Sequence, residues 1–419
     1  MIPYGQALDI LRRAAAERGA AGEETVALHE ALGRVCAQRV LSAESLPRFD
    51  NSAMDGFAVV AGETSSASGA KPLRLPVLGS LAAGDEPRDC SRGRPGPCAY
   101  EIMTGAPIPG GFDAVVKVED TTVLEGGRAV AVSAPVQPGE HVRCAGEDFK
   151  AGVTVLDPGT MLEPAHLLAL AALGVSDLSV RRRPKAGLIS TGRELVPYSK
   201  MPGPGQVRNA SGLYIPAALR RLGAEVEDFG TSPDDPADFR RRLERAMGWG
   251  ADLVVTTGAV SMGRYDFVAD AVTSMGAQTL FHKTATRPGK PGLFARFPNG
   301  PLLFGLPGNP VSSVVVLRFF AVPVLRRLLG MREEEPVRLR LEAPVAKRDG
   351  IRCFLKARAS VTPEGGSVRV LPGQGSFELR PLLEANAWAV MPEPGDGVPA
   401  GTVVDVFPSL PNEGGWGPR

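Results

Sequence analysis

Three glycine-rich loops carry hydroxyl and carboxylate side chains, and each loop follows a short apolar run. They are STGRE at 190–194, TTGAVSMGRYD at 256–266 and GLPGNP at 305–310. Glycine lets the backbone approach a ligand closely, and free N–H groups and hydroxyls can donate hydrogen bonds to it. If the apolar runs are strands of one parallel sheet, the loops meet at the carboxyl edge, where ligands bind. Together they predict a cradle for phosphate groups.

Carboxylates accompany these loops. Glu194 and Asp266 lie within the first two, and Asp234 and Asp235 follow a neighbouring apolar run. Carboxylates repel a phosphate unless a cation lies between them, and Mg²⁺ prefers one or two carboxylates together with phosphate oxygens. Acidic residues also favour helix starts, and we expect Asp235 to serve only as an N-cap. The pattern predicts a magnesium-dependent reaction of a phosphate or nucleotide.

A basic turn lies between the second and third loops. The sequence RPGKP at 287–291 places Arg287 and Lys290 on either side of a Pro-Gly turn. The turn is either a solvated surface feature or a clamp for an oxyanion, since arginine presents a planar fork and lysine a point charge. The residues alone leave both interpretations open.

Two polar segments of the first half of the chain are equally open. RFDNSAMDGFA at 48–58 carries the polar groups of Asp50, Asn51 and Asp55, and MTGAP at 103–107 carries the hydroxyl of Thr104. Each segment is either a tight turn stabilised by local side-chain hydrogen bonds or part of a binding loop.

The elements that would position these loops change character along the chain. Alternating strand and helix patterns predict a mostly parallel sheet with helices on both faces, whereas short β-type runs broken by Gly and Pro are typical of all-β domains. Two amphipathic or apolar helices are expected at 4–18 and 163–173, and we expect them to pack together. The fold class is therefore multidomain α/β and β. The expected domains are a split helical or linker domain (1–26 plus 146–180), an inserted β domain (27–145), an α/β domain (181–330), a C-terminal β domain (331–410) and a tail (411–419).

The composition excludes several classes of protein. With 43% hydrophobic residues the 419-residue chain is not disordered, and a formal charge of +1 does not favour a generic nucleic-acid binder. The five cysteines form no C-x-x-C pair, which favours a reducing compartment over disulfides or a zinc site. No apolar run has the length of a membrane span, and the first residues lack the core of a signal peptide. We expect a soluble, cytoplasmic protein with no nucleic-acid or membrane partner.

Seven motifs, taken in order, resemble those of the molybdopterin molybdenumtransferases, a family to which the E domain of gephyrin is related. They are RFDNSAMDGFAV, MTGAPIP, RCAGEDFKAG, ISTGREL, TTGAVSMGRYDF, RPGKP and GLPGNPVSS, and the resemblance covers residues 4–407. It implies a molybdopterin-binding type of α/β domain and a C-terminal β-barrel. It also implies an elongated homodimer in which the SAMDG loop of one subunit faces the α/β domain of the other.

The resemblance implies a reaction as well. Adenylylated molybdopterin and molybdate are the substrates, AMP and the molybdenum cofactor are the products, and Mg²⁺ or a similar cation assists. Transient contacts with the molybdopterin adenylyltransferase and with acceptor molybdoenzymes are further implied partners. Three alternatives are a sister adenylyltransferase, a diverged non-catalytic paralogue that binds pterin or acts as a scaffold, and a tungstate-preferring version of the transferase.

Residue roles follow from the matching motifs. Glu194 and Asp266 are expected to hold or orient the metal and the pyrophosphate, with Asp234 as a third candidate ligand. Asp55 matches the SAMDG aspartate, which the partner subunit supplies, and Thr104 matches the MTGA threonine. The basic turn, with Lys356 and Ser376, resembles the molybdate-holding region. The remaining cofactor-binding candidates are loop residues: Thr191, Gly192, Gly258, Ser261, Gly263, Arg287, Lys290, Pro307, Gly308, Asn309 and Pro310.

Four residues depart from the family pattern. Arg193 stands where the family usually has Asp in STGDEL, and Ala259 replaces the second Gly of TGGVS. Arg287 replaces the first Lys of KPGKP, and Lys356 stands in place of an Arg. The change to Arg193 exchanges a negative charge for a positive one beside the expected cation.

Overall fold

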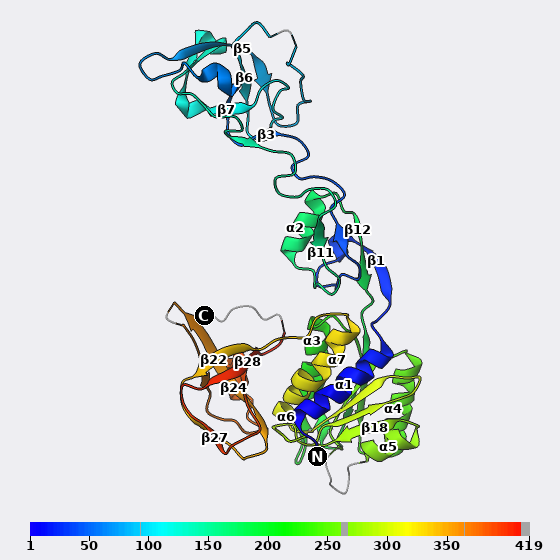
Figure 1. The fold of residues 1–419 in the computed structure, drawn as a ribbon. Coiled ribbons are helices and arrows are strands. Elements are labelled where there is room, and N and C mark those ends of the chain that lie inside the picture. The colour runs from blue at the N-terminus through cyan, green and yellow to red at the C-terminus, as the bar shows by residue number, and fades with distance from the viewer. Residues whose placement is uncertain (93, 261–266, 364, 412–419) are drawn as a thin grey trace.

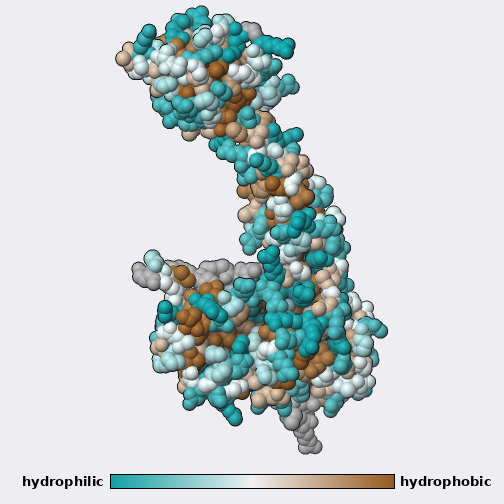
Figure 2. Space-filling model, viewed as in Figure 1, coloured by the Kyte–Doolittle hydropathy of each residue, from teal (hydrophilic) through white to brown (hydrophobic). Residues whose placement is uncertain are grey.

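The computed structural model is elongated and describes residues 1–92, 94–260, 267–363 and 365–411. Figures 1 and 2 show a wide base, a narrow middle segment and an arm at the far end. The base comprises residues 1–18 and 185–411, the middle segment residues 22–46 and 146–181, and the arm residues 51–143. The chain therefore leaves the base, runs to the arm and returns. Within the described residues, no helix is long and apolar enough to cross a membrane.

A six-stranded sheet forms the centre of the base. Its strand order is β16-β13-β17-β21-β20-β18; the first four strands are parallel, and β20 is antiparallel to both neighbours. The predicted mostly parallel sheet is confirmed, although the antiparallel strand β20 was not predicted. The bounds are β13 (Lys185–Thr191), β16 (Glu225–Ser232), β17 (Leu253–Thr257), β18 (Gln278–His282), β20 (Leu293–Arg296) and β21 (Leu302–Leu306).

Helices cover both faces of this sheet. Successive residues of a strand point to opposite faces, so Val255 of β17 packs into one core while Val254 packs into the other. The first core includes α1 (Tyr4–Arg18), α3 (Ser211–Arg221), α6 (Pro310–Val316) and α7 (Val322–Leu328), the last two joined by a π-helical turn, Leu317–Ala321. The second core includes α4 (Pro236–Gly248) and α5 (Val268–Ser274).

The predicted packing of the two early helices on each other is wrong. Helix α1 has the predicted bounds, but its buried residues, Tyr4, Ala7, Leu11 and Ala14 among them, belong to the core shared with α7. Helix α2 (Pro164–Ala172) instead buries Leu170 in a separate core of the middle segment. The apolar residues of the two helices indicate that each packs against something, but they do not specify the partner.

The middle segment and the arm are built from strand pairs that join distant parts of the chain. In the middle segment β1 (Glu23–Ala27) pairs with β12 (Asp177–Arg181), and β2 (Val40–Leu41) pairs with β11 (Thr154–Leu156). The arm begins with β3 (Asn51–Ser52) beside β10 (Val142–Arg143). Its six-stranded sheet has the order β7-β4-β6-β5-β9-β8: β4 (Gly56–Val59), β5 (Leu73–Leu81), β6 (Ala99–Ile102), β7 (Ala114–Lys117), β8 (Thr121–Leu124) and β9 (Ala129–Val132).

The C-terminal part of the base is a closed barrel of five strands. The sheet runs β24-β25-β22-β28-β26, and the pairing of β24 with β26 closes it. A two-residue strand of the basic turn, β19 (Thr286–Arg287), pairs with the start of β24 and so joins the barrel to the α/β domain. The bounds are β22 (Val337–Leu341), β24 (Arg352–Thr362), β25 (Gly365–Val370), β26 (Ala387–Met391) and β28 (Val403–Pro408).

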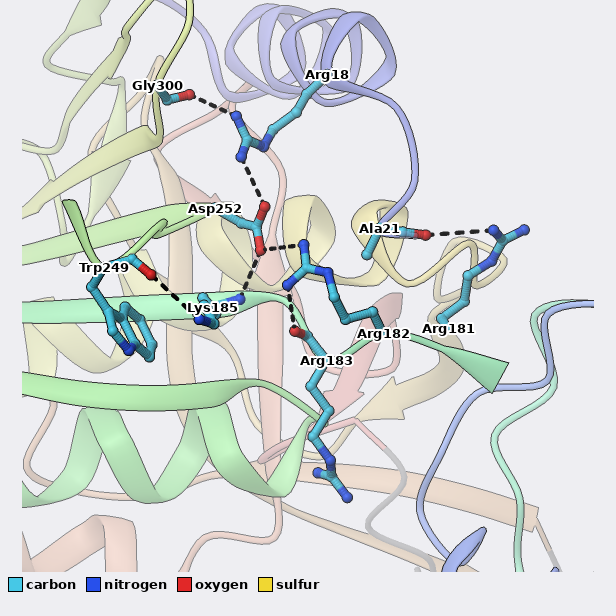
Figure 3. Close-up of polar contacts among 9 residues, drawn as sticks. All are labelled: Arg18, Ala21, Arg181, Arg182, Arg183, Lys185, Trp249, Asp252 and Gly300. Carbon is cyan, nitrogen blue, oxygen red and sulfur yellow. Dashed lines mark hydrogen bonds and ion pairs between the residues drawn. The ribbon is translucent and has the colours of Figure 1, made fainter. Parts of the chain in front are cut away.

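A buried carboxylate joins the base to the middle segment (Figure 3). Asp252 accepts hydrogen bonds from Arg18 at the end of α1 (2.8 Å), from Arg182 after β12 (2.9 Å) and from the N–H of Lys185 (2.8 Å). Only 8% of Asp252 is exposed. Burial raises the pKa of this carboxyl, but the hydrogen bonds from Arg18, Lys185 and Arg182 outweigh burial, so the pKa lies below its ordinary value. The charge of Asp252 thus holds α1, the returning strand and the sheet together.

Replacing Asp252 by Ala is expected to lower the free energy of unfolding by about 3 kcal/mol, because two guanidinium groups lose their partner. The depressed pKa means that this contribution is present above the unfolded-state pKa, about 4, and is lost as pH falls through the folded-state pKa. Urea unfolding at several pH values measures both effects.

The matched control is Asp9→Ala, which removes an exposed ion pair with Arg12 (2.9 Å) and should cost less than about 1 kcal/mol. Equal losses for the two variants, or a loss for Asp252→Ala that persists unchanged at low pH, would contradict the assigned role of Asp252.

Candidate active site

The carboxyl ends of β13, β17 and β21 open into one cavity of about 740 Å³. All three predicted loops contribute to it, as do the segment before α3 and the barrel loop that follows β25. The lining residues that the sequence singled out are Thr191, Gly192, Glu194, Asp234, Gly258, Pro307, Gly308, Asn309 and Pro310. The structure therefore brings these residues to one edge of the sheet, as expected for parallel strands.

Two glycines allow close contacts at the sheet edge, Gly258 between the first two loops and Gly192 within the first loop. Gly258 has φ +82°, and a Cβ there would lie 2.6 Å from the carbonyl oxygen of Thr191. Gly192 has φ +142°, and a Cβ would lie 2.7 Å from a carboxylate oxygen of Glu194. The hydroxyl of Thr191 donates to the carbonyl of Thr257 (2.8 Å), which fixes the two strand ends to each other. A side chain at position 258 would push the first two loops apart.

Two carboxylates line the cavity within the described part of the chain. Glu194 follows the first loop, and Asp234 accepts a hydrogen bond from the N–H of Arg193 (3.2 Å). Asp235 does not share this position: its side chain accepts from the N–H of Ala237 (2.9 Å) at the start of α4, which confirms the predicted N-cap. In the described ranges no group of three or more potential metal-ligating residues gathers. Asp266, Ser261 and Gly263 lie outside the described residues.

The barrel contributes one wall through the loop around Ser376. Asn309 donates to the hydroxyl of Ser376 (3.2 Å), and the N–H of Val311 donates to its carbonyl (3.1 Å). The buried amine of Lys356 donates to the carbonyls of Gly375 (3.2 Å) and Glu378 (3.0 Å). Burial lowers the pKa of Lys356, and the charge of Glu378 opposes this. Lys356 thus fixes the loop that carries Ser376.

The basic turn lies between the α/β domain and the barrel. Arg287 belongs to β19, and its register partner in β24 is Cys353. The carbonyl of Lys290 accepts a hydrogen bond from the N–H of Thr284 (2.9 Å), and Pro291 lines the cavity. Both cationic residues are exposed, and neither lines the cavity.

Asp55 and Thr104 lie together, but in the arm. The N–H of Thr104 (2.6 Å) and its hydroxyl (2.8 Å) both donate to one carboxylate oxygen of Asp55. These two bonds, the N–H first, lower the pKa of the exposed Asp55 carboxyl, which keeps it ionised at neutral pH. Figure 1 shows β3, which precedes this loop, on the arm and away from the α/β sheet. Within one chain this pair does not meet the cavity.

Several cavity residues were not predicted from the sequence. Asn209 joins the sheet to α3: its amide donates to the hydroxyl of Ser190 (2.9 Å), and its carbonyl accepts from the N–H of Gly212 (2.8 Å). Arg208 and Ser211 beside it and Phe377 of the barrel also line the cavity. The sequence could have identified Asn209. It lies just before α3, the first helix after β13, and residues at the start of such a helix lie at the carboxyl edge of the sheet. Phe377 had no such signal.

Comparison with known proteins places the chain in a family. Residues 2–174 match the MoeA N-terminal region (domain I and II), residues 187–327 a probable molybdopterin binding domain, and residues 338–409 the MoeA C-terminal region (domain IV). A molybdopterin molybdenumtransferase from Synechococcus elongatus is 42% identical over 410 residues, 97% of this chain and 99% of the relative. Molybdopterin molybdenumtransferase 2 from Mycobacterium tuberculosis is 39% identical over 91% of this chain and 94% of that protein.

The chain belongs to the molybdopterin molybdenumtransferase family. The crystal structure of a molybdopterin biosynthesis MoeA protein from Pyrococcus horikoshii has the same architecture, with a TM-score of 0.79 and 29% identity over 97% of this chain and 99% of that one. The multidomain α/β and β fold class is therefore confirmed.

One departure from the family motif has a visible structural consequence. Ala259, which replaces the second Gly of TGGVS, has φ +51°. Glycine adopts this left-handed conformation readily, whereas an L-residue with a Cβ is disfavoured there by about 1–2 kcal/mol.

The contact between the first two loops gives a stability prediction. Gly258→Ala and Gly250→Ala both place a Cβ at the same φ, +82° and +83°, but nothing lies within 4 Å of the Cβ at Gly250. Gly250→Ala should cost about 1–2 kcal/mol of unfolding free energy from backbone strain. Gly258→Ala should cost about 1–3 kcal/mol more, because its Cβ meets the Thr191 backbone. Urea unfolding measures the difference, and equal costs would mean that the loops do not depend on close contact.

Proposed function

We propose that this protein inserts molybdenum into adenylylated molybdopterin and releases AMP. Family membership over nearly the whole chain carries this proposal, and the cavity at the sheet edge supports it. In the reaction the dithiolene sulfurs bind molybdenum while one molybdate oxygen leaves as water. Hydrolysis of the pyrophosphate bond consumes one water and releases AMP. The water released from molybdate equals the water consumed, so the overall reaction neither uses nor forms water.

The loop residues suit the pyrophosphate and its counter-ion. The loops that carry Gly258 and Gly308 lie at the edge where a phosphate would rest. The hydroxyl of Thr191 donates to the carbonyl of Thr257, so it holds the strand ends in place rather than the phosphate. Glu194 and Asp234 supply two carboxylates to the same cavity, which is the protein contribution that Mg²⁺ prefers when phosphate oxygens complete its shell. The bound cation would neutralise the pyrophosphate charge. The role of Asp266 as a third ligand stays a prediction.

We also infer that the working enzyme is a homodimer in which each site takes residues from both subunits. The Asp55–Thr104 pair lies in the arm, at the far end of the molecule from the cavity of its own chain. Large apolar side chains are exposed next to this pair, namely Phe49, Met54 and Met103. An exposed apolar rim around a carboxylate favours docking against a second surface.

Helix α2 offers a further contact for a second copy. Its sequence, PAHLLALAA, is almost entirely apolar, yet Leu170 is its only buried residue and Leu168 is 75% exposed. Hydrophobic atoms are visible at the surface of the middle segment in Figure 2, where α2 lies in Figure 1. An apolar helix with no cover on its outer face favours packing against a second subunit.

The test of the reaction is AMP release from adenylylated molybdopterin with Mg²⁺ and molybdate. The wild-type protein should release AMP only when the oxyanion is present. Glu194→Gln should lower the rate about hundredfold, because it removes a charge from the cation site. Glu335→Gln, at an exposed position outside the cavity, is the matched control and should leave the rate unchanged.

Oxyanion-independent release by the wild-type protein, or no release at all, would contradict the proposed reaction. If the Glu194→Gln variant kept more than half of the wild-type rate, the proposed reaction would still hold, but Glu194 would not be part of the cation site. Replacing molybdate by tungstate in the same assay measures the preference between the two oxyanions.

A further inference from the structure

Phe377 is an aromatic side chain left in water at the wall of the cavity. It lines the cavity together with Asn309 and Pro310, and 72% of it is exposed. Burying a phenylalanine side chain stabilises a fold by roughly 1.5–3 kcal/mol. Because Phe377 is mostly exposed, it contributes little of this stabilisation. A single exposed apolar residue needs no explanation elsewhere on a surface, but here it borders the candidate active site.

The loop that carries Phe377 is rigidly held. Gln374 donates to the carbonyls of Lys356 (2.9 Å) and Leu371 (2.7 Å) and accepts from the N–H of Lys356 (3.0 Å). The N–H of Gly375 donates to the carboxylate of Glu378 (2.5 Å). The carbonyls of Gly375 and Glu378 bind the Lys356 amine, as described above. These bonds fix the backbone on both sides of Phe377, so the side chain leaves the loop from a defined point beside the cavity.

The chemistry of the substrate supplies a partner for such a ring. Adenylylated molybdopterin contains two flat heterocycles, the pyrimidine ring of the reduced pterin and the adenine, separated by the pyrophosphate. An aromatic side chain stacks on a flat heterocycle without needing hydrogen bonds, and such stacking contributes about 1–3 kcal/mol for a nucleic-acid base. A preorganised ring loses little entropy on binding.

We propose that Phe377 is the stacking platform for the pterin ring of the substrate, an inference that rests on the proposed function. Phe377 directly follows Ser376, so their Cα atoms are about 3.8 Å apart. Ser376 and the basic turn form the expected molybdate-holding side of the cavity. The dithiolene that receives molybdenum is attached to the pterin, so the pterin lies on this side. In this arrangement the adenylate lies on the other side of the cavity, towards the carboxylates Glu194 and Asp234.

The test measures dissociation constants by calorimetry, with molybdate omitted so that no turnover occurs. The probes are adenylylated molybdopterin and AMP. Phe377→Ala and Phe377→Leu should weaken binding of adenylylated molybdopterin about tenfold or more, since both remove the aromatic face. Phe377→Trp should bind within twofold of the wild type. All three variants should bind AMP within twofold, because AMP contains no pterin.

Leu383→Ala is the matched control, because Leu383 is also an exposed apolar residue of the barrel segment, 89% exposed, and is absent from the cavity lining. It should change neither dissociation constant. Thermal unfolding of each variant shows that the fold is intact.

Four results would overturn the inference. Unchanged binding of adenylylated molybdopterin by Phe377→Ala would mean that the ring makes no contact with it. An equal loss of affinity for AMP would mean that Phe377 receives the adenine. Equal losses for Phe377→Ala and Leu383→Ala would point to a general effect of the barrel surface. Failure of the wild-type protein to bind adenylylated molybdopterin would overturn the proposed function together with this inference.

Discussion

The ion pairs of Asp252 set the direction in which the molecule extends. This carboxylate lies at the start of β17, where it meets Arg18 of α1 and Arg182 of the strand that returns from the arm. A charge that is mostly buried requires partners at fixed positions, because an unpaired charge in such a place is costly. The middle segment and the sheet therefore keep one relative orientation at this junction (Figure 3).

This orientation explains why the functional residues form two groups. The sheet edge and the barrel enclose the cavity with Glu194, Asp234 and Ser376 beside it, whereas Asp55 and Thr104 lie at the other end of the molecule. Glycines at the sheet edge bring the loops together, and the Lys356 amine fixes the loop on the barrel side. A second copy is the simplest means of completing the proposed site.

The sequence identified local features well and contacts between segments poorly. The capping role of Asp235 and the meeting of three loops follow from helix chemistry and from the geometry of parallel strands, so both could be predicted. The packing of α1 on α7 could not, because apolar spacing reveals a buried face but not its partner. Phe377 was missed for a similar reason: its position at the cavity results from the docking of the barrel, which no local pattern encodes.

The most direct test of the shared site uses dimers purified through two different affinity tags. A dimer of one Asp55→Ala subunit and one Glu194→Ala subunit should retain about half of the wild-type rate of AMP release, because one of its two sites receives both intact residues. A dimer of a wild-type subunit and a subunit with both substitutions should be inactive, since each site then lacks one residue. The opposite pattern, with the first dimer inactive and the second half-active, would show that each chain completes its own site and would contradict the account.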